Sequence, residues 1–409
     1  MRVAIALLCC GIVWAQQSQQ TDQDDLRTRL SEAGNSTPEF SRALEAHLKK
    51  FPASSQKAEV ERTLFRAAIE LKDNERVVKY GAAILATDPE DMQALEFTSR
   101  ALLVSDSKEA ATQALVFAKQ FEKVLRNLEP KPGAEPLRWQ QRAELDQSMG
   151  RALVFQSRAV GNLGQVEEAL KLAKTSFEAN GSAEAAREQA RWLGKLNKFD
   201  EAAESFALGY ALAANDAERE RDLKLLRETW KKGHPDETGA GDKLIIGFDK
   251  ATQMRAARKA KLQAIDPNAL ETDAMRYTLP GVAGIKLPLV SLKGKVVIMD
   301  FWATWCGPCR TQHPLYEVVK QKFKGRDDVV FLAIATDEEP TLVEPFLTAQ
   351  KWSKQVYFES GLSRLLSVSS IPTTVIFNKK GEVASRMNGF VPERFVDSLT
   401  DRIQQILAE

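Results

Sequence analysis

Two cysteines separated by two residues are the part of the sequence best suited to chemistry. Cys306 and Cys309 enclose Gly307 and Pro308, where an apolar run ends and a segment of helical spacing begins. Cysteines at this spacing can close a disulfide ring only where the backbone turns, as it does in the first turn of a helix. Unpaired N–H groups and the positive end of the helix dipole favour a thiolate there, so we expect the pKa of Cys306 to lie below about 8.5.

The positions of the two sulfurs predict different roles. Cys306, at the end of the helix, is the expected nucleophile that attacks a substrate disulfide. Cys309 lies one turn inside the helix, so we expect it to be the more buried sulfur and to resolve the mixed disulfide. Pro308 suits the first helical turn, where an N–H group has no partner. The motif therefore predicts thiol–disulfide exchange.

A metal site and a peroxidase site are the alternatives. Cys306, Cys309 and His313 are metal ligands by type, but the chain has no second Cys-x-x-Cys pair that would complete a set of four ligands. We therefore expect no metal ion and no other cofactor, and we expect His313 to face solvent or a partner. A peroxiredoxin would use a lone peroxidatic cysteine rather than a dithiol.

Apolar runs of strand length alternate with helical patterns over the C-terminal third of the chain. Strands are expected at 296–302, 329–335, 373–377 and 382–389, and an amphipathic helix is expected at 392–407. This alternation predicts an α/β fold with a central sheet. The cysteine motif then follows one of the strands and opens a helix.

The motif and its surroundings resemble the thioredoxin superfamily, in its exported TlpA-like (redoxin-type) branch. The resemblance rests on the run 294–310, a short β-hairpin segment at 279–292, the place of an inserted helix at 337–352, and Ile371-Pro372, which matches the cis-proline loop of the family. It covers residues 276–409 and implies an α/β thioredoxin-like domain.

The resemblance also implies site residues around the cysteines. Cys306 and Cys309 would form a reversible disulfide. Pro372 would lie against Cys306, keep metal ions out and offer backbone groups to a substrate peptide. The implied substrate contacts are Trp305, Gly307, Pro308, Ile371 and Pro372.

Two departures from the branch draw attention to Asp300. The branch often has Glu three residues after the second cysteine, where this chain has Gln312, and it often has Asn at the position of Asp300. The lysine that faces the buried acid of thioredoxin has no counterpart in the strand at 332–336. We therefore expect burial without a cationic partner to raise the pKa of Asp300, which would accept the proton of Cys309. The alternative is an exposed aspartate at the end of a strand.

Residues 22–232 form a second region with a different composition and hydrophobic pattern. They are rich in strong helix formers, and the segment 163–169 recurs 33 residues later as 196–202. A helix–turn–helix period of about 33–34 residues resembles the tetratricopeptide repeat. We expect an all-α array of helical hairpins that binds a protein partner; the alternative is an array that only spaces or dimerises the protein. Residues 233–275 are expected to form a linker and a connecting helix.

The N-terminus has the layout of a secretory signal peptide at residues 1–15. Arg2 precedes an apolar stretch over 3–14, and a polar segment follows. Cleavage would leave a mature chain with two cysteines, both in the motif. We therefore expect an exported, periplasmic protein. A lipoprotein signal that ends at Cys9 or Cys10 and an apolar helix that is retained are the alternatives.

Composition and motif together give two functional hypotheses. Lys+Arg number 57 and Asp+Glu 56, and this net charge of +1 argues against nucleic-acid binding. The first hypothesis is an exported thiol–disulfide oxidoreductase that reduces protein disulfides, because Gly-Pro between the cysteines resembles the reducing members of the family. By the same resemblance, a membrane thiol donor would supply the electrons. The alternative is a helical-repeat binding or assembly module with an accessory thioredoxin-like domain.

Overall fold

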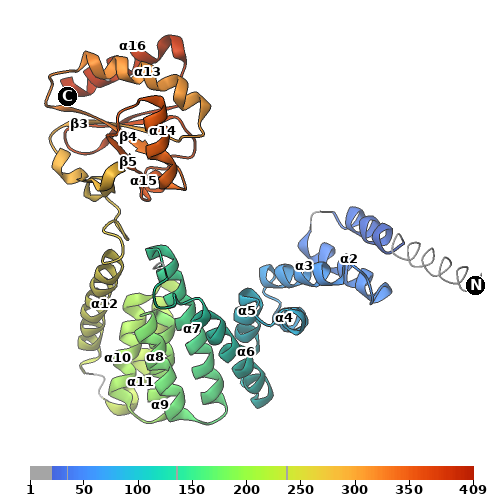
Figure 1. Cartoon of the computed structure of the whole chain (residues 1–409). Helices are drawn as coiled ribbons and strands as arrows, with labels where there is room; N and C mark the ends of the chain where they lie inside the picture. Colours follow the sequence, from blue (N-terminus) through green and yellow to red (C-terminus); the bar gives the residue numbers. More distant parts are fainter. Residues whose placement is uncertain (1–20, 35, 135–136, 236–237) are drawn as a thin grey trace, which may run out of the picture. The chain divides into compact units, whose positions relative to one another are not determined.

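The structure is a computed structural model that describes residues 21–34, 36–134, 137–235 and 238–409. The expected signal peptide, with Cys9 and Cys10, lies outside the described residues. The chain divides between Ala257 and Arg258 into two compact units, an N-terminal unit of helices and a C-terminal unit that contains a sheet (Figure 1). Each unit is described by itself.

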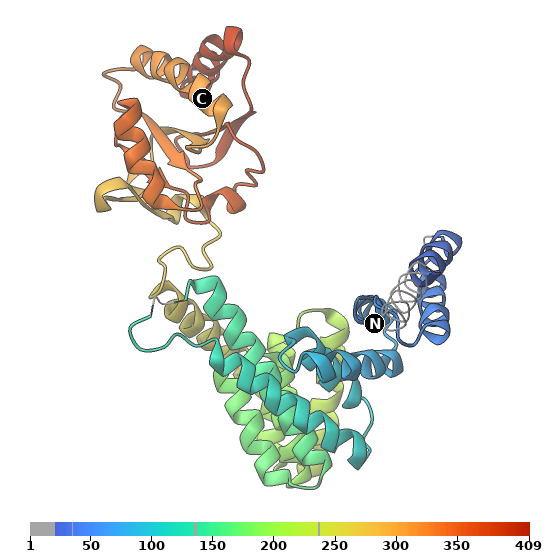
Figure 2. The ribbon, with the colours of Figure 1, turned by 45° about the vertical axis from the view of Figure 1, so that its right-hand side comes forward.

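The N-terminal unit is an array of helices joined by short turns. Helices that follow one another in the chain pack side by side, as α7 to α10 do in Figure 2. The last turns of α12 extend past the boundary between the units. The helices are α2 (Thr37–Lys50), α3 (Lys57–Glu70), α4 (Asn74–Thr87), α5 (Met92–Leu102), α6 (Lys108–Asn127), α7 (Trp139–Asn162), α8 (Val166–Ala179), α9 (Ala183–Lys195), α10 (Phe199–Leu212), α11 (Asp216–Gly233) and α12 (Ala240–Gln263).

Three of the helical hairpins turn in the same way. Lys72, Gly164 and Asn197 have left-handed backbones, with φ of 56°, 94° and 59°. In each turn the next N–H donates to the carbonyl five residues earlier, at 2.9, 3.1 and 3.0 Å, which is the Schellman ending of a helix. Ala169 and Ala202, which follow two of these turns, are fully buried. The two segments of the 33-residue period thus share one turn geometry.

Charged pairs link alternate helices of the array. Arg158 on α7 donates to Glu188 on α9 at 2.8 Å, and Arg187 on α9 donates to Asp222 on α11 at 2.7 Å. The Asp222 carboxylate is fully buried, so it depends on this guanidinium for compensation. The pairs fix the spacing between helices that are two apart in the sequence.

The C-terminal unit is built on a five-stranded sheet in the order β5-β4-β3-β6-β7. Strand β3 runs parallel to β4, β4 runs parallel to β5, and β6 and β7 are antiparallel to their neighbours. A separate hairpin, β1 with β2, precedes the sheet. The strands are β1 (Thr278–Pro280), β2 (Lys286–Pro288), β3 (Val296–Trp302), β4 (Val329–Ala335), β5 (Val356–Phe358), β6 (Thr373–Phe377) and β7 (Val383–Asn388).

Helices cover both faces of this sheet (Figure 1). Side chains alternate between the faces along β3, so Val296 and Ile298 pack against α13 and α16, whereas Val297 and Met299 pack on the opposite side. Asp300 therefore points to the α13 face. The helices are α13 (Gly307–Lys322), α14 (Val343–Gln350), α15 (Leu362–Leu365) and α16 (Pro392–Ala408), with short 3₁₀ helices at Ala274–Arg276, Val282–Gly284, Leu289–Leu292 and Pro340–Leu342.

The structure confirms the predicted fold class, an all-α array followed by an α/β domain. The four expected strands correspond to β3, β4, β6 and β7, and the expected last helix is α16. The three-residue strand β5 and the helix α15 were not predicted. Both are too short to produce a clear hydrophobic period.

Candidate active site

The two cysteines of the motif form a disulfide at the start of α13. Their Cα atoms are 5.3 Å apart. Cys306 is the N-cap residue of the helix, and its Sγ accepts a hydrogen bond from the backbone N–H of Cys309 at 3.2 Å. The sulfur of Cys306 therefore lies where the helix presents its unpaired N–H groups and the positive end of its dipole.

The two cysteines are equally enclosed in this oxidised form. Cys306 is 3% exposed and Cys309 is 4% exposed, so the expectation that Cys309 is the more buried residue is wrong for the disulfide. Closing the ring ties the Cys306 sulfur to the helix, and both cysteines pack in one apolar cluster with Trp302 and Leu347. This packing cannot be predicted from the positions of the two cysteines in the helix.

Asp337 stabilises the turn between β3 and α13 by hydrogen bonds. This residue was not predicted from the sequence. Its carboxylate accepts hydrogen bonds from the backbone N–H of Thr304 at 3.1 Å and from the Thr304 hydroxyl at 2.5 Å. Beside it, the N–H of Thr336 donates to the carbonyl of Trp302 at 2.8 Å. Parallel strands end at the same edge of a sheet, and Asp337 closely follows β4, which is parallel to β3. Its position after this strand is the feature of the sequence that could have indicated its place near the end of β3.

Asp300 is buried below this turn, on the face of β3 that α13 covers. It is 6% exposed, so the alternative of an exposed aspartate at the strand end is wrong. Its Oδ1 accepts hydrogen bonds from Gln312 Nε2 at 2.8 Å and from Thr374 Oγ1 at 3.3 Å. Burial raises the pKa of Asp300 to about 7, against these two hydrogen bonds, which lower it. Among the described residues, no lysine or arginine pairs with this carboxyl.

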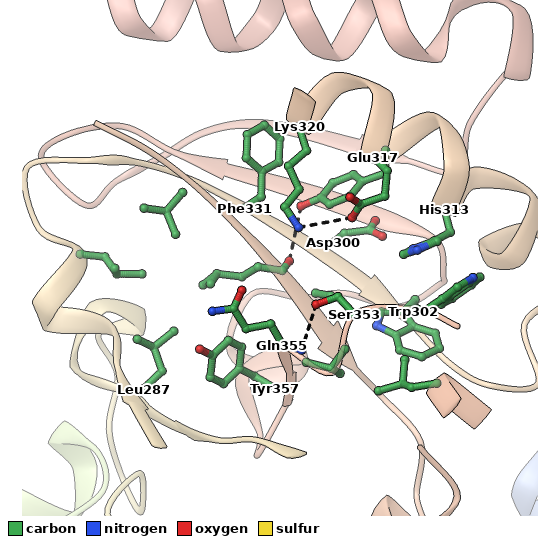
Figure 3. Close-up of a pocket in the computed structure, with 18 residues that line it drawn as sticks. Leu287, Asp300, Trp302, His313, Glu317, Lys320, Phe331, Ser353, Gln355 and Tyr357 are labelled. Atoms are coloured by element: carbon green, nitrogen blue, oxygen red, sulfur yellow. Dashed lines mark hydrogen bonds and ion pairs between the residues drawn. The ribbon is translucent and has the colours of Figure 1, made fainter. Parts of the chain in front are cut away.

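A cavity of about 170 Å³ opens beneath α13 and reaches Asp300 (Figure 3). Glu317 and Lys320 of α13 form an ion pair at 3.4 Å on its wall. Tyr316 also lines it, and burial raises the pKa of this phenol well above its ordinary range. The acid is thus enclosed in the protein but borders a small cavity whose wall includes the ion pair of Glu317 and Lys320.

His313, which was expected to face solvent or a partner, is half-buried on α13. Its ring stacks on Trp352, with centroids 3.5 Å apart and an interplanar angle of 16°. Trp352 in turn contacts Trp302 at a centroid distance of 5.5 Å. Burial lowers the pKa of His313, which favours the neutral form of the stacked ring.

The expected substrate contacts differ in their exposure and packing. Trp305 is 68% exposed, and Gly307 and Pro308 are exposed beside it. Ile371 packs against the cluster that contains both cysteines, and its peptide bond to Pro372 is cis. The carbonyl of Pro372 accepts a hydrogen bond from the N–H of Gly389 at 2.7 Å.

Two kinds of feature are not found in the part of the chain that the structure describes. No three Cys, His, Asp or Glu side chains there converge in a way that could hold a metal ion. None of the helices among the described residues is both long enough and apolar enough to cross a membrane.

Residues 294–383, which include the disulfide and Asp300, match the family described as thioredoxin-like. The C-terminal unit is a thioredoxin-like domain. This agrees with its central mixed sheet and with the Cys-x-x-Cys motif at the start of α13. The family match does not extend to the helical array.

Relatives of this thioredoxin-like domain are named as thiol–disulfide oxidoreductases. The chain is 29% identical over 136 residues to a thiol-disulfide oxidoreductase ResA of Bacillus cereus, across 33% of this chain and 76% of that protein. It is 28% identical over 135 residues to ResA of Bacillus subtilis, across 32% of this chain and 75% of that protein. The thioredoxin-like domain is therefore of the thiol–disulfide oxidoreductase type.

A solved structure is also similar to the thioredoxin-like domain. It is a thiol:disulfide interchange protein of the thioredoxin family from Chlorobium tepidum TLS, 27% identical to this chain. The match covers 34% of this chain and 98% of that one, with a TM-score of 0.30.

Proposed function

We propose that this protein is an exported reductase of protein disulfides that works through the dithiol of Cys306 and Cys309. The observation that carries the proposal is the place of the Cys306 sulfur, at the N-cap of α13 and 3.2 Å from the N–H of Cys309. A thiolate at this position gains hydrogen bonds and a favourable dipole, and the thiolate is the form that attacks a disulfide.

The proposed reaction has two exchange steps. In the reduced protein, the Cys306 thiolate attacks one sulfur of a substrate disulfide. A bond forms between these two sulfurs, and the other substrate sulfur leaves as a thiolate that takes a proton from solvent. Cys309 then attacks the Cys306 sulfur as a thiolate. The Cys306–Cys309 bond forms, and the bond to the substrate breaks as the substrate sulfur leaves as a thiolate, which takes a proton from solvent. Two electrons have passed from the dithiol to the substrate.

Asp300 is the proposed proton acceptor in the second step. Cys309 attacks as a thiolate, so its proton must leave first. The pKa of Asp300 is raised to about 7 by burial, so near neutral pH the carboxyl is part ionised and can take that proton. The cavity beneath α13, with Glu317 and Lys320 on its wall, is the proposed route by which the proton leaves.

The proposed substrate surface is the exposed rim of the motif. Trp305, Gly307 and Pro308 stand open to solvent there and can contact a polypeptide. Ile371 and Pro372 would offer their backbone groups from the facing loop. Such a surface suits disulfide-containing proteins rather than a small molecule held in a closed pocket.

Export and the direction of electron flow belong to the same proposal. The leader-like residues 1–15 and the restriction of the remaining cysteines to the motif support export to the periplasm. A reductase in such a compartment must itself be reduced again, which requires a dithiol donor. We propose a membrane thiol protein as that donor. Mass spectrometry of the mature protein checks the leader, because a chain that keeps Met1 contradicts it.

We propose that the helical array is tetratricopeptide-like and recruits a protein partner or substrate. Two observations support this: the shared left-handed turns at Gly164 and Asn197, and the ion pairs between alternate helices. In the alternative, the array is the main module and the thioredoxin-like domain is accessory. The intact dithiol at the N-terminus of α13 favours the reductase.

Reduction of insulin disulfides tests the proposal. We expect the reduced full-length protein to accelerate this reaction and the Cys306→Ser variant to lose the acceleration. The Cys309→Ala variant is expected to accumulate mixed disulfides through Cys306 and so to capture the native substrates. If wild-type protein is no faster than Cys306→Ser, the proposed activity is wrong.

A further inference from the structure

We propose that Gln312 is a positioning residue for thiol–disulfide exchange, whose side-chain amide holds the Asp300 carboxyl in both of its protonation states. The inference rests on the proposed function, in which Asp300 accepts the proton of Cys309. It assigns a role to a residue that neither attacks nor accepts a proton.

The geometry joins the resolving cysteine to Asp300 through Gln312. Cys309, Gln312 and Tyr316 follow one another on the buried face of α13, at spacings of three and four residues. Gln312 is 1% exposed, and its Nε2 donates to Asp300 Oδ1 at 2.8 Å. The amide therefore lies on the same helix face as Cys309 and in direct contact with the acid.

The other end of the same amide explains why both protonation states can be held. The Oε1 of Gln312 is buried and has no hydrogen-bond partner among the described residues. A buried acceptor without a partner costs free energy, so such a group usually has a use. Turning the amide by about 180° exchanges Nε2 and Oε1. In one orientation the amide donates to the carboxylate of Asp300, and in the other it accepts from the protonated carboxyl.

The remaining groups around Asp300 do not duplicate this role. Thr374 on β6 is the other hydrogen-bond donor to the carboxyl, at 3.3 Å. The facing residue on β4, Ala333, has no polar side-chain atom. None of the other titratable side chains that line the cavity beneath α13 hydrogen bonds to Asp300. They are His313, Tyr316, Glu317 and Lys320 on α13 and Tyr357 on β5.

The two residues in contact are also the two departures seen in the sequence. Gln312 brings an amide and Asp300 brings a carboxyl to one buried hydrogen bond. If the carboxyl stood at position 312 and the amide at position 300, the same two groups would still form the hydrogen bond. The pair therefore acts as one unit, and either position can carry the acid.

The Gln312→Leu variant tests this inference in the reduced full-length protein. The pKa of Asp300 is read from its carboxyl signal by isotope-edited infrared or 13C spectroscopy, and the resolving step is followed against pH. A hydrogen bond to the ionised carboxylate is stronger than one from the protonated carboxyl, so loss of the amide should raise the pKa of Asp300 by about one unit. The pH profile of the resolving step should shift by the same amount, and its rate at pH 7 should fall about fivefold. Gln321→Leu, at an exposed position of the same helix, is the control and should change neither.

An Asp300 pKa that stays within about 0.3 unit of the wild-type value overturns the inference. If Gln312→Leu does not fold, Gln312→Glu has the same length and places a second carboxyl against Asp300. Two carboxyls in contact cannot both ionise readily, so the pair should show one pKa well above that of Asp300 in the wild type, and the absence of such a raised pKa again contradicts the inference. The pKa is measured without turnover, so this failure is distinct from a failure of insulin reduction.

Exchange of the two side chains gives the sharper test. Asp300→Asn alone should slow the resolving step and remove the part of its pH dependence that follows the Asp300 carboxyl, leaving that of the Cys309 thiol. Asp300→Asn combined with Gln312→Glu should restore the pH dependence and bring the rate to within about tenfold of wild type. A double variant that is no faster than Asp300→Asn shows that the amide and the carboxyl do not act as a pair.

Discussion

The sulfur of Cys306 differs from that of Cys309 in its place on α13, not in its burial. The N–H of Cys309 points at it over 3.2 Å, and the helix dipole favours negative charge there. We therefore predict that alkylation of the reduced protein at about pH 6.5 labels Cys306 before Cys309. Peptide mapping by mass spectrometry measures the order.

The single variants Cys306→Ser and Cys309→Ser separate the two thiols as controls. Each leaves one thiol in the motif, whose rate of alkylation can be followed against pH. The remaining Cys306 should react as a thiolate at lower pH than the remaining Cys309. Faster labelling of Cys309 would reverse the roles that we assign to the two sulfurs.

Asp300 should make the stability of the thioredoxin-like domain depend on pH. Its pKa is raised from 3.8 to about 7 on folding, so its protonated form stabilises the fold below about pH 4, and this contribution is lost as the pH rises through 7. The loss amounts to roughly 4 kcal/mol between these limits. Asp300→Asn removes the titrating group, so we expect a higher Tm than wild type at pH 8 and a similar Tm at pH 4.

Thermal unfolding at the two pH values measures this effect. Asp401→Asn changes an exposed aspartate of α16 and should leave the difference between pH 4 and pH 8 as it is in wild type. An Asp300→Asn protein that gains no stability at pH 8 would mean that the carboxyl is not penalised by burial.

The sequence was informative about Asp300 because a single strand explains its burial. The run at 296–302 is apolar on both sides of the acid, which predicts an interior strand. Its contact with Gln312 could not be predicted in this way, because it requires α13 to pack on the face of β3 that carries Asp300. The stacking of His313 on Trp352 has the same origin, since it depends on how a distant segment returns to α13.

At the scale of elements, the end of β4 holds the end of β3. The Asp337 carboxylate binds both the N–H and the hydroxyl of Thr304, two residues before Cys306. Asp337→Ala leaves these donors without their partner, which should cost about 1–3 kcal/mol of stability. We predict faster amide exchange at Thr304 and a lower rate of insulin reduction.

Asp337→Asn is the matched control, because its amide keeps one oxygen that can accept from Thr304. It should retain most of the activity and of the protection from exchange. If the Asp337→Ala variant shows wild-type amide exchange at Thr304 and wild-type insulin reduction, the hydrogen bonds of Asp337 do not position the active site.

The strands that could be predicted from the sequence are those whose own residues show a clear apolar run. Strands β3, β4 and β6 are apolar runs, and each is paired on both sides in the sheet. Strand β5 has three residues at the sheet edge and depends on its pairing with β4 and on a bridge from Gly281 to Tyr357. Such an element is stabilised by contacts distant in sequence, so no local period indicates it.

At the scale of the whole molecule, each unit has a core of its own. The clusters of buried side chains around α13 and the sheet draw only on residues 274–407 of the thioredoxin-like unit, and those of the array draw only on residues 26–244. A unit with its own core can fold alone. We therefore expect the C-terminal unit to fold and to reduce insulin without the array.

The start of such a fragment decides its stability, because Asn268 belongs to the C-terminal unit. Its buried side chain pairs with both backbone groups of Thr278: Oδ1 accepts from the N–H at 2.7 Å, and Nδ2 donates to the carbonyl at 2.9 Å. A fragment of residues 258–409 keeps this pairing, whereas a fragment of residues 270–409 leaves the two backbone groups at the start of β1 without it. Two such hydrogen bonds contribute about 1–3 kcal/mol.

We predict that both fragments reduce insulin at pH 7 and that the longer fragment has the higher Tm. Asn268→Ala in the longer fragment should lower its Tm to that of the shorter fragment. Equal melting of all three would mean that Asn268 lies outside the cooperative unit, and an inactive 258–409 fragment beside an active full chain would mean that the array completes the active site.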